Sequence, residues 1–296
     1  MYLNDDLISD HNYSISNNKS FKNIEIKVNH ADYVLTLSAV IKDNIMYSPH
    51  FGTFSNLRVN TNDTSIIKIL IKNLFMDLQK KYDEFYITFP PTFYNKNINF
   101  IIKELLSYEV FIKSCELNNH IVCEDVTKFS RGNKKKLNKL ITEKFVFKKG
   151  NLSDLRLAYD IIKENRSIKG YQLSMSFEKL DFLFKKFSNK FNIWLVYNGN
   201  GEAVASSITV DLVSHSRYVF YWGDKERKDA NSPIVLIANK LVNENIKNGT
   251  NILDLGTSSV NGQINIGLKK FKNSLGAIDS QKITVGYKKK KFKLYQ

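Results

Sequence analysis

Apolar and polar residues alternate along the second half of the chain with two different periods, which predict a mixture of strands and helices. Alternation at every second residue predicts a strand at residues 144–149, and runs rich in β-forming residues predict further strands at 191–197, 203–210 and 217–222. The second and third of these are joined by Asn198-Gly199-Asn200-Gly201, and an Asn-Gly pair between two strands is a strong signal for a hairpin. This half is therefore predicted to contain an antiparallel meander.

Apolar residues recur at helical spacing between and after these strands. One helix is predicted to open at residues 151–154 and a second to span 176–187. A third should begin at Ser232-Pro233, an N-cap and first-turn pair, and stop near Asn248-Gly249. The apolar positions of this third helix are Ile234, Ile237, Ala238, Leu241 and Ile246. The remaining elements are predicted, in order, as a buried strand at 251–255, a loop at 256–262, a helix at 263–272 and closing strands around Ala277 and at 283–287.

The first half of the chain repeats the later part of this order. Its strands, loops and helices alternate as residues 44–48, 51–62, 63–81, 84–89, 90–96 and 98–106, followed by a strand through Val110 and Ile112. Only strands, at 24–28 and 33–41, precede the repeated part. We therefore predict a duplication with domains at 1–125 and 126–296, in which the first copy is truncated and lacks two early helices. The copies share almost no identical residues, so chance agreement of alternating elements stays open as an alternative at this stage.

Length and composition agree with two domains. The chain has 296 residues, of which 43% are hydrophobic, enough for two cores of ordinary size. No apolar run approaches the roughly 20 residues that cross a bilayer, and the N-terminal segment is polar. We therefore expect a cytoplasmic protein without membrane insertion. Cys115 and Cys123 are expected to be reduced thiols, and the histidines show no metal-ligand spacing, so we expect no metal.

The charge is strongly positive, with a formal net charge of +15 and a pI near 9.5. Part of the excess lies in two lysine clusters, at residues 134–136 and 288–291. Such a charge suits nucleic acid, an anionic membrane surface or an anionic small molecule, but it is also typical of a solvated lysine face.

The order of elements over 144–287 resembles the GNAT acyltransferase fold, in which two central strands splay apart to admit the pantetheine arm of coenzyme A. A truncated copy followed by a complete one resembles the FemAB-like N-acyltransferases. Residues 130–140 (SRGNKKKLNKL) look like the basic helix that precedes the second half in that family. Residues 254–258 (DLGTS) and 267–276 (GLKKFKNSLG) resemble its ending of strand, glycine-serine loop and FKxxxG. The resemblance implies an α/β (α+β) protein of two tandem GNAT-like domains, with mixed central sheets flanked by helices.

This resemblance implies acyl transfer to an amine, which needs a proton acceptor and donors for the developing oxyanion. His50 ends the central strand of the first half, and its imidazole titrates near neutrality. Asp224 ends the corresponding strand of the second half, where a carboxylate suits an amine. Lys272 matches the lysine of the Fem-like ending, which is placed to stabilise negative charge. We take these three as catalytic candidates, against the alternatives of a loop histidine, a turn aspartate and a solvated lysine.

Other residues are candidates for binding. The substrate-binding candidates are Arg131, Tyr221, Trp222, Ser258, Ser259 and Asn261. The serines and the asparagine follow a buried strand, Arg131 suits a phosphate, and the two aromatic residues suit stacking on a base or sugar. Ser232 and Lys269 are the candidates for binding the cofactor. The usual glycine-rich phosphate loop of GNAT enzymes is absent from the sequence, and residues 224–231 occupy its place.

Two substrate classes fit the resemblance. The first is acyl-coenzyme A as co-substrate with a nucleotide-linked (dTDP or UDP) deoxyamino sugar, on the way to surface polysaccharide such as lipopolysaccharide. The second is a Fem-type peptidyltransferase that uses aminoacyl-tRNA. The compact chain has no long helical insertion, which favours the first. A non-catalytic RNA-binding protein is the alternative from another class, because a lysine-rich helix and tail also suit RNA.

Overall fold

The computed structural model describes residues 22–49, 53–124, 128–225 and 232–290. The chain divides into two compact units that interleave along the sequence. Unit 1 comprises Met1–Leu117, Ser259–Gln263 and Ser280–Gln296, and unit 2 comprises Asn118–Ser258 and Ile264–Asp279. None of the helices in the described ranges is both long and apolar enough to span a membrane.

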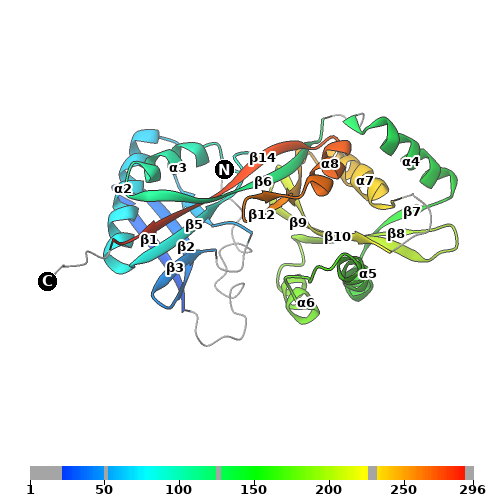
Figure 1. The fold of residues 1–296 in the computed structure, drawn as a ribbon, viewed down its shortest axis with the longest axis horizontal. Helices are drawn as coiled ribbons and strands as arrows, with labels where there is room; N and C mark the ends of the chain where they lie inside the picture. Colours follow the sequence, from blue (N-terminus) through cyan, green and yellow to red (C-terminus); the bar gives the residue numbers. More distant parts are fainter. Residues whose placement is uncertain (1–21, 50–52, 125–127, 226–231, 291–296) are drawn as a thin grey trace. The chain divides into compact units, whose positions relative to one another are not determined.

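Unit 1 is a sheet with helices on one face (Figure 1). Its elements are β1 (Lys22–His30), β2 (Tyr33–Lys42), β3 (Ile45–Ser48), β4 (Leu57–Val59), α2 (Thr64–Lys81), β5 (Glu84–Phe89) and α3 (Ile98–Leu106). The strand order is β1-β2-β3-β5, followed by β14 (Ile278–Lys288) and β6 (Val110–Val122), and β4 pairs with β2. β3 and β5 are parallel, and the pairs β1/β2, β2/β3 and β5/β14 are antiparallel.

The core of unit 1 follows from its sequence periods. Every second residue of β5, namely Phe85, Ile87 and Phe89, is buried in the same apolar cluster as the inner face of α2. Asp63 caps α2, because its side chain accepts from the backbone N–H of Ser65. Strand alternation and helical spacing therefore meet in one core between the sheet and its helices.

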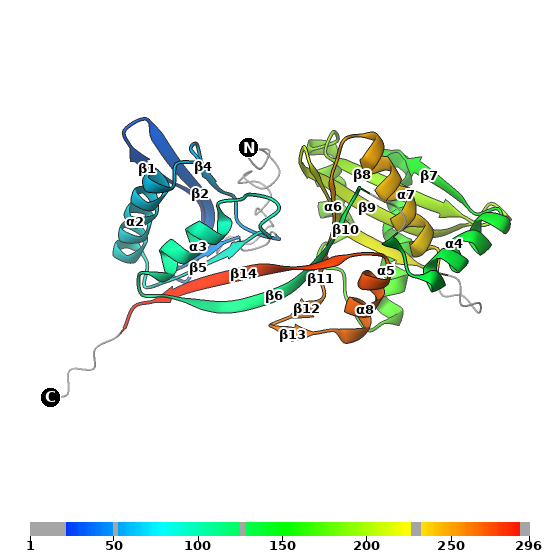
Figure 2. The ribbon, with the colours of Figure 1, turned by 90° about the horizontal axis from the view of Figure 1, so that it is seen from above.

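Unit 2 is a sheet with helices on both faces. Its elements before the last strand are α4 (Arg131–Thr142), β7 (Val146–Gly150), the 3-10 turn η2 (Leu152–Asp154), α5 (Leu155–Ile168), α6 (Phe177–Lys186), β8 (Phe191–Tyr197), β9 (Ala203–Val213), β10 (Ser216–Asp224), α7 (Ile234–Lys247), β11 (Ile252–Thr257) and α8 (Ile266–Ser274). The strand order is β7-β8-β9-β10-β11-β6. α5 and α6 lie on one face of this sheet, and α4, α7 and α8 lie on the other (Figures 1 and 2). This is the complete copy that the sequence predicts.

The two units exchange strands. β6 follows α3 of unit 1, but its end pairs antiparallel with β11 of unit 2. β14 follows α8 of unit 2, but most of it pairs antiparallel with β5 of unit 1. Each unit therefore completes its sheet with a strand that continues from the other.

The structure confirms the tandem fold, with helices on both faces of the second sheet and no counterpart of α5 and α6 in the described part of unit 1. Some details of the sequence prediction are wrong, among them the loop at 51–62, which contains the strand β4. The predicted helix over 263–272 begins only at Ile266, because Gln263–Ile264 pairs with Ser259–Val260 in a short hairpin, β12–β13. Ile246, one of the apolar positions assigned to the third helix, is 42% exposed, since it lies in the last turn of α7. The predicted strands around Ala277 and at 283–287 are one strand, β14.

Candidate functional site in unit 2

The two central strands of unit 2 diverge. β10 and β11 pair in parallel only over Ser216–Tyr218 and Ile252–Asp254. Beyond that point β10 continues along β9 to Asp224, with a register shift between Val219 and Tyr221, and β11 continues along β6 to Thr257. The splayed pair that the resemblance implies is therefore present, and the residues that follow each strand are the first place to look for a site.

Lys272 lies beside the diverging end of β11. It belongs to α8 but is only 2% exposed, unlike the neighbouring Lys270, which is exposed. Its Nζ donates to the carbonyl oxygen of Gly256 at 2.8 Å and to that of Thr257 at 2.9 Å. The cation is therefore held on the backbone of the last two residues of β11, and it is not a solvated helix lysine.

The surroundings of Lys272 favour its neutral form. Burial lowers the pKa of Lys272 from 10.5 to about 7, the Asp254 carboxylate acts in the opposite direction, and the Arg166 guanidinium lowers it further. Both protonation states are therefore populated near neutrality. In the charged state two of the three N–H groups serve the two carbonyls and one remains for a ligand; in the neutral state a lone pair takes its place.

Asp224 is held at the end of β10 by two side chains. Asn165 Nδ2 on α5 donates to the Asp224 carbonyl oxygen at 2.6 Å and to Oδ1 at 3.0 Å. Ser232 Oγ donates to Oδ2 at 2.8 Å. Ser232 was expected to cap the following helix, but that helix begins at Ile234 with Pro233 as a cap that makes no side-chain hydrogen bond. The serine instead fixes the orientation of the Asp224 carboxylate.

The two aromatic candidates that precede Asp224, Tyr221 and Trp222, lie in different surroundings. Tyr221 is 8% exposed and shares a hydrogen bond of 2.5 Å with Ser174 Oγ. Burial raises the pKa of Tyr221, so it stays neutral. Trp222 is half-buried and meets Phe271 of α8 edge-on, with ring centroids 6.2 Å apart. Trp222 is the more open of the two.

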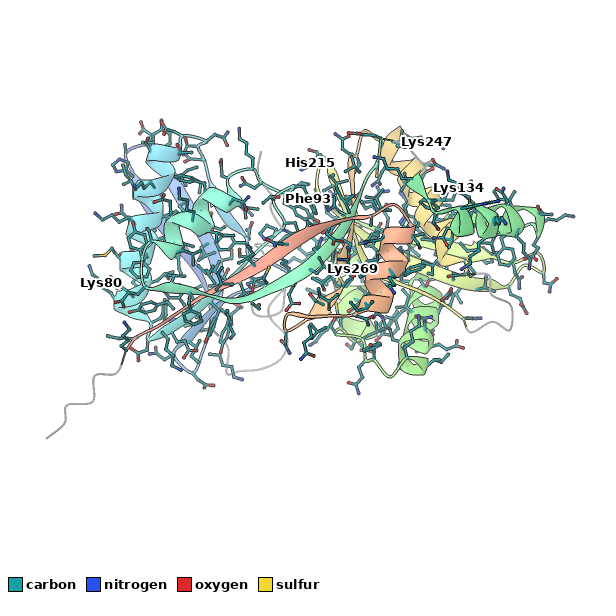
Figure 3. The ribbon with its side chains drawn as sticks, turned by 45° about the horizontal axis from the view of Figure 1, so that its top comes forward. Lys80, Phe93, Lys134, His215, Lys247 and Lys269 are labelled. Carbon is teal, nitrogen blue, oxygen red and sulfur yellow. The ribbon has the colours of Figure 1, made fainter. Side chains whose placement is uncertain are left out.

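The loop after β11 contains a chain of polar contacts. Ser258 Oγ donates to Asn119 Oδ1 at 2.5 Å, and Asn119 Nδ2 donates to Asp279 Oδ1 at 2.9 Å. Lys269, labelled on α8 in Figure 3, forms an ion pair with Asp279 at 2.8 Å. These contacts therefore link the candidates Ser258 and Lys269 through Asn119 and Asp279, which were not selected from the sequence.

The remaining candidates are separate from these contacts. Ser259 Oγ lies in unit 1 and donates to Glu116 Oε2 at 2.5 Å. Asn261 is exposed in the β12–β13 turn with a positive φ of 52°. Arg131 is exposed as the first residue of α4. His50 lies outside the described residues.

Besides Asn119 and Asp279, two further polar residues of this region were not among the candidates selected from the sequence, Asp254 and Asn165. Asp254 is fully buried, and Asn165 is 8% exposed. The signal for Asp254 was a carboxylate within the otherwise apolar run of β11, Ile252-Leu253-Asp254-Leu255, since acidic residues are rarely buried without partners. Asn165 had no comparable signal, because amides are common on helices.

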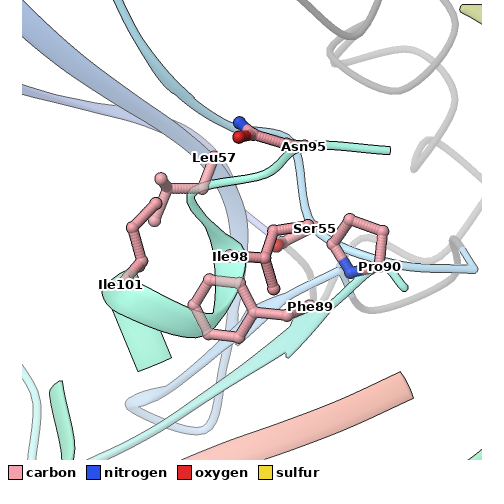
Figure 4. Close-up of a pocket in the computed structure, with 7 residues that line it drawn as sticks. All are labelled: Ser55, Leu57, Phe89, Pro90, Asn95, Ile98 and Ile101. Carbon is pink, nitrogen blue, oxygen red and sulfur yellow. The ribbon is translucent and has the colours of Figure 1, made fainter. Parts of the chain in front are cut away.

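Within the described ranges, no group of three or more His, Cys, Asp or Glu side chains could hold a metal ion. Unit 1 contains a small pocket at the end of β5 and the start of α3 (Figure 4). It encloses about 260 Å³ including open solvent, and its lining residues are Ser55, Leu57, Phe89, Pro90, Asn95, Ile98 and Ile101. This lining is largely apolar and holds no charged side chain.

Comparisons with known proteins give structural likeness without sequence likeness. No protein-family model matches the sequence, and no curated protein matches it. The crystal structure of FemX covers 90% of this chain and 88% of its own at a TM-score of 0.68 and 10% identity. The match to a conserved protein of unknown function from Bacteroides thetaiotaomicron covers 87% of this chain and 86% of that protein, with a TM-score of 0.60 and 12% sequence identity. The match to the structure of L-PGS from Bacillus licheniformis covers 90% of this chain and 85% of that protein, with a TM-score of 0.58 and 13% sequence identity. The chain therefore has the tandem fold of FemX across nearly its whole length.

Proposed function

We propose that this chain is a transferase that moves an acyl or aminoacyl group to an amine, with the reacting centre beside Lys272 of unit 2. The observation that carries the proposal is a buried lysine with a pKa of about 7, held by two backbone carbonyls where β10 and β11 diverge. Attack of an amine on a thioester or ester carbonyl places negative charge on the carbonyl oxygen. The remaining N–H of charged Lys272 stabilises that charge in a site from which water is largely excluded.

Asp224 is proposed to hold the attacking amine or to accept its proton. Its carboxylate is oriented by Asn165 and Ser232, and it stands at the end of the other diverging strand. A fixed carboxylate lowers the entropy lost when an ammonium is positioned for attack. His50, the other proton acceptor suggested by the sequence, stays a proposal.

For the substrates, we propose acyl-coenzyme A as donor and a nucleotide-linked deoxyamino sugar as acceptor. Both are polyanions, which agrees with the net charge of +15. Lys269 and Ser232 are the proposed contacts to coenzyme A, and Arg131, Trp222 and Ser258 are among the proposed contacts to the acceptor.

A Fem-type reaction with an aminoacyl-tRNA donor is the second candidate. The likeness to FemX supports it, and so does the exposed basic surface of α4, where Lys134 projects from the helix (Figure 3). The pattern of charge alone does not separate this donor from coenzyme A, because both are anionic.

A transfer assay with purified protein separates the candidates. Acetyl-coenzyme A is offered with dTDP- and UDP-linked amino sugars, aminoacyl-tRNA is offered with the same acceptors and with a UDP-linked muropeptide, and products are detected by mass spectrometry. Acylated sugar from the first mixture alone supports the coenzyme A proposal, and product from tRNA mixtures alone supports the Fem-type reaction. A protein that forms no product, but whose melting temperature rises with RNA and loses that rise as salt increases, would instead be an RNA-binding protein.

A further inference from the structure

Asp254 is a buried acidic residue that the mechanism above does not use. It lies on β11 opposite Tyr218, the last residue of β10 that still pairs with β11, and it is fully buried. Its Oδ1 accepts from Asn118 Nδ2 at 2.8 Å and from the backbone N–H of Gly256 at 2.9 Å. The carboxylate therefore stands at the point where the two central strands begin to separate.

The hydrogen bond that the Gly256 N–H donates to the Asp254 carboxylate shapes the backbone that holds Lys272. An aspartate that accepts from the N–H two residues later forms a local turn, and here that turn places Gly256 in the left-handed region at φ +74°. A side chain at this position would be strained by that φ, although a Cβ would meet Tyr218 Oη only at an ordinary 3.4 Å. The turn directs the carbonyls of Gly256 and Thr257 to the same Nζ. The carboxylate is thus linked to Lys272 through one peptide segment.

Asp254 also acts on Lys272 by its charge. Among the described residues, the charged groups that act on Lys272 are Asp254 from β11 and Arg166 from α5, which have opposite effects on its protonation. His120 of β6 stands opposite Asp254 in the register, and burial lowers its pKa, which favours the neutral imidazole. On α8 itself, Lys269 is paired with Asp279 and Lys270 is exposed. Asp254 is therefore the negative charge that favours the ammonium form of Lys272 in this buried place.

We propose that Asp254 is a positioning residue that shapes the Gly256–Thr257 carbonyl pair and keeps Lys272 charged for the chemical step. The part that concerns the chemical step rests on the proposed transferase function. The part that concerns the charge of Lys272 does not, because it can be measured without substrate.

The direct test is the protonation of Lys272 in the Asp254→Asn variant. Asparagine keeps an oxygen that accepts from Gly256 but removes the charge. Lysine side chains are labelled with 13C at Cε, the signal of Lys272 is assigned by its loss in Lys272→Arg, and the signal is followed from pH 5 to 10. The midpoint is expected near 7 in the unaltered protein and at least about 1 pH unit lower in Asp254→Asn. An unchanged midpoint would overturn the proposal.

A second variant keeps the test decisive if Asp254→Asn does not fold. A buried ammonium that loses its counter-charge is strongly destabilising, whereas removal of both groups is tolerated. The double variant Asp254→Asn/Lys272→Met should then recover a cooperative melting transition. A double variant that is as poorly folded as the single one would show that Asp254 only supports the strand, and the proposal would fail.

The catalytic part has its own outcome once a donor is known. If charged Lys272 is the active form, kcat falls as pH rises through the Lys272 midpoint, and Asp254→Asn moves that fall to lower pH with KM unchanged. A KM change without a shift in the pH profile would contradict the positioning role. A protein with the expected midpoints but no transfer activity would sink the proposed function and leave the link between Asp254 and Lys272 in place.

Discussion

The strand-loop-helix segment from β5 to α3 recurs from β11 to α8 with the same lengths. β5 and β11 have 6 residues each, and α3 and α8 have 9 residues each. Corresponding bounds all differ by 168, since they are Glu84 and Ile252, Phe89 and Thr257, Ile98 and Ile266, and Leu106 and Ser274. This regularity, together with parallel central strands in both units, is what a duplicated module leaves when its residues have diverged.

The same offset shows where the two copies differ in chemistry. Thr88 of unit 1 corresponds to Gly256 of unit 2. The Thr88 carbonyl accepts from the backbone N–H of Ser55 at 2.7 Å, whereas the Gly256 carbonyl accepts from Lys272. In unit 1 a backbone N–H from the loop before β4 therefore occupies the carbonyl at this position. In unit 2 the titratable side chain of Lys272 occupies the corresponding carbonyl. The two units thus share a backbone arrangement, and the candidate reacting centre lies in unit 2, where the Gly256 carbonyl accepts from a side chain instead of from the backbone.

The largest expected effect comes from Lys272→Met, which removes the buried cation at the end of β11 in unit 2. Loss of one donor to a developing oxyanion lowers kcat by roughly 100- to 1,000-fold. We expect a loss of that order in the transfer assay, with the fold retained by circular dichroism.

Two controls sharpen this comparison of the units. Lys270→Met removes an exposed lysine from the same helix, and Glu104→Gln alters the residue that corresponds to Lys272 in unit 1. Both are expected to keep full activity. An equal loss in Glu104→Gln would mean that unit 1 contributes to the chemistry at the same position.

The next effect is a dependence of stability on pH. Lys272 has a pKa of about 7 in the folded chain, against 10.5 for an ordinary lysine, so between these values the unfolded chain binds the additional proton. Stability then rises with pH, by roughly 1 kcal/mol per pH unit over this window, and is flat below it. Urea unfolding at pH 7.5 and 9 should show a larger increase for the unaltered protein than for Lys272→Met. Equal increases would mean that the lysine is not neutral when folded.

The helices that only unit 2 carries make a third prediction. A Cβ at Gly223 would lie 2.9 Å from Asn165 Cβ and 3.1 Å from Ile162 Cα, so α5 approaches β10 as closely as it does because position 223 is a glycine. Gly223→Ala should lower the free energy of unfolding by about 1–3 kcal/mol. Gly132→Ala is the matched control, because a Cβ there meets nothing within 4 Å and alanine favours the helix. If both variants are equally stable, α5 is not packed as described.

Much of this fold could be predicted because the local pattern and the tertiary environment agree. The strands Phe191–Tyr197 and Glu84–Phe89 and the helix Ile98–Leu106 have the predicted bounds, since each is an apolar run at a single period between polar turns. The exchange of β6 and β14 could not be predicted, because it depends on pairing between residues more than a hundred positions apart. The same reason explains the error at 263–272, where two residues pair with a hairpin partner before the helix begins.

The candidate site divides in the same way. The resemblance selected Lys272, but its two carbonyl partners depend on the turn at Gly256, which only the structure shows. Asp224 was selected as a strand-end residue, while its partner Asn165 lies 59 positions earlier on another element. Residues that terminate elements can be found from a sequence; the side chains that orient them come from the packing of distant segments.

The smallest effect concerns a hydroxyl in each unit. Ser55 of unit 1 is 1% exposed, and its Oγ has no hydrogen-bond partner within the described part of the chain. Ser258 of unit 2 is equally buried, but its Oγ donates to Asn119 Oδ1. A buried hydroxyl without a partner destabilises a fold, so Ser55→Ala should leave the free energy of unfolding unchanged or raise it by up to about 1 kcal/mol. Ser258→Ala should lower it by about 1–2 kcal/mol, because it also leaves the Asn119 acceptor unpaired. Urea unfolding of both variants measures the difference, and an equal loss in Ser55→Ala would show that the hydroxyl beside the pocket of unit 1 is as firmly bonded as that of unit 2.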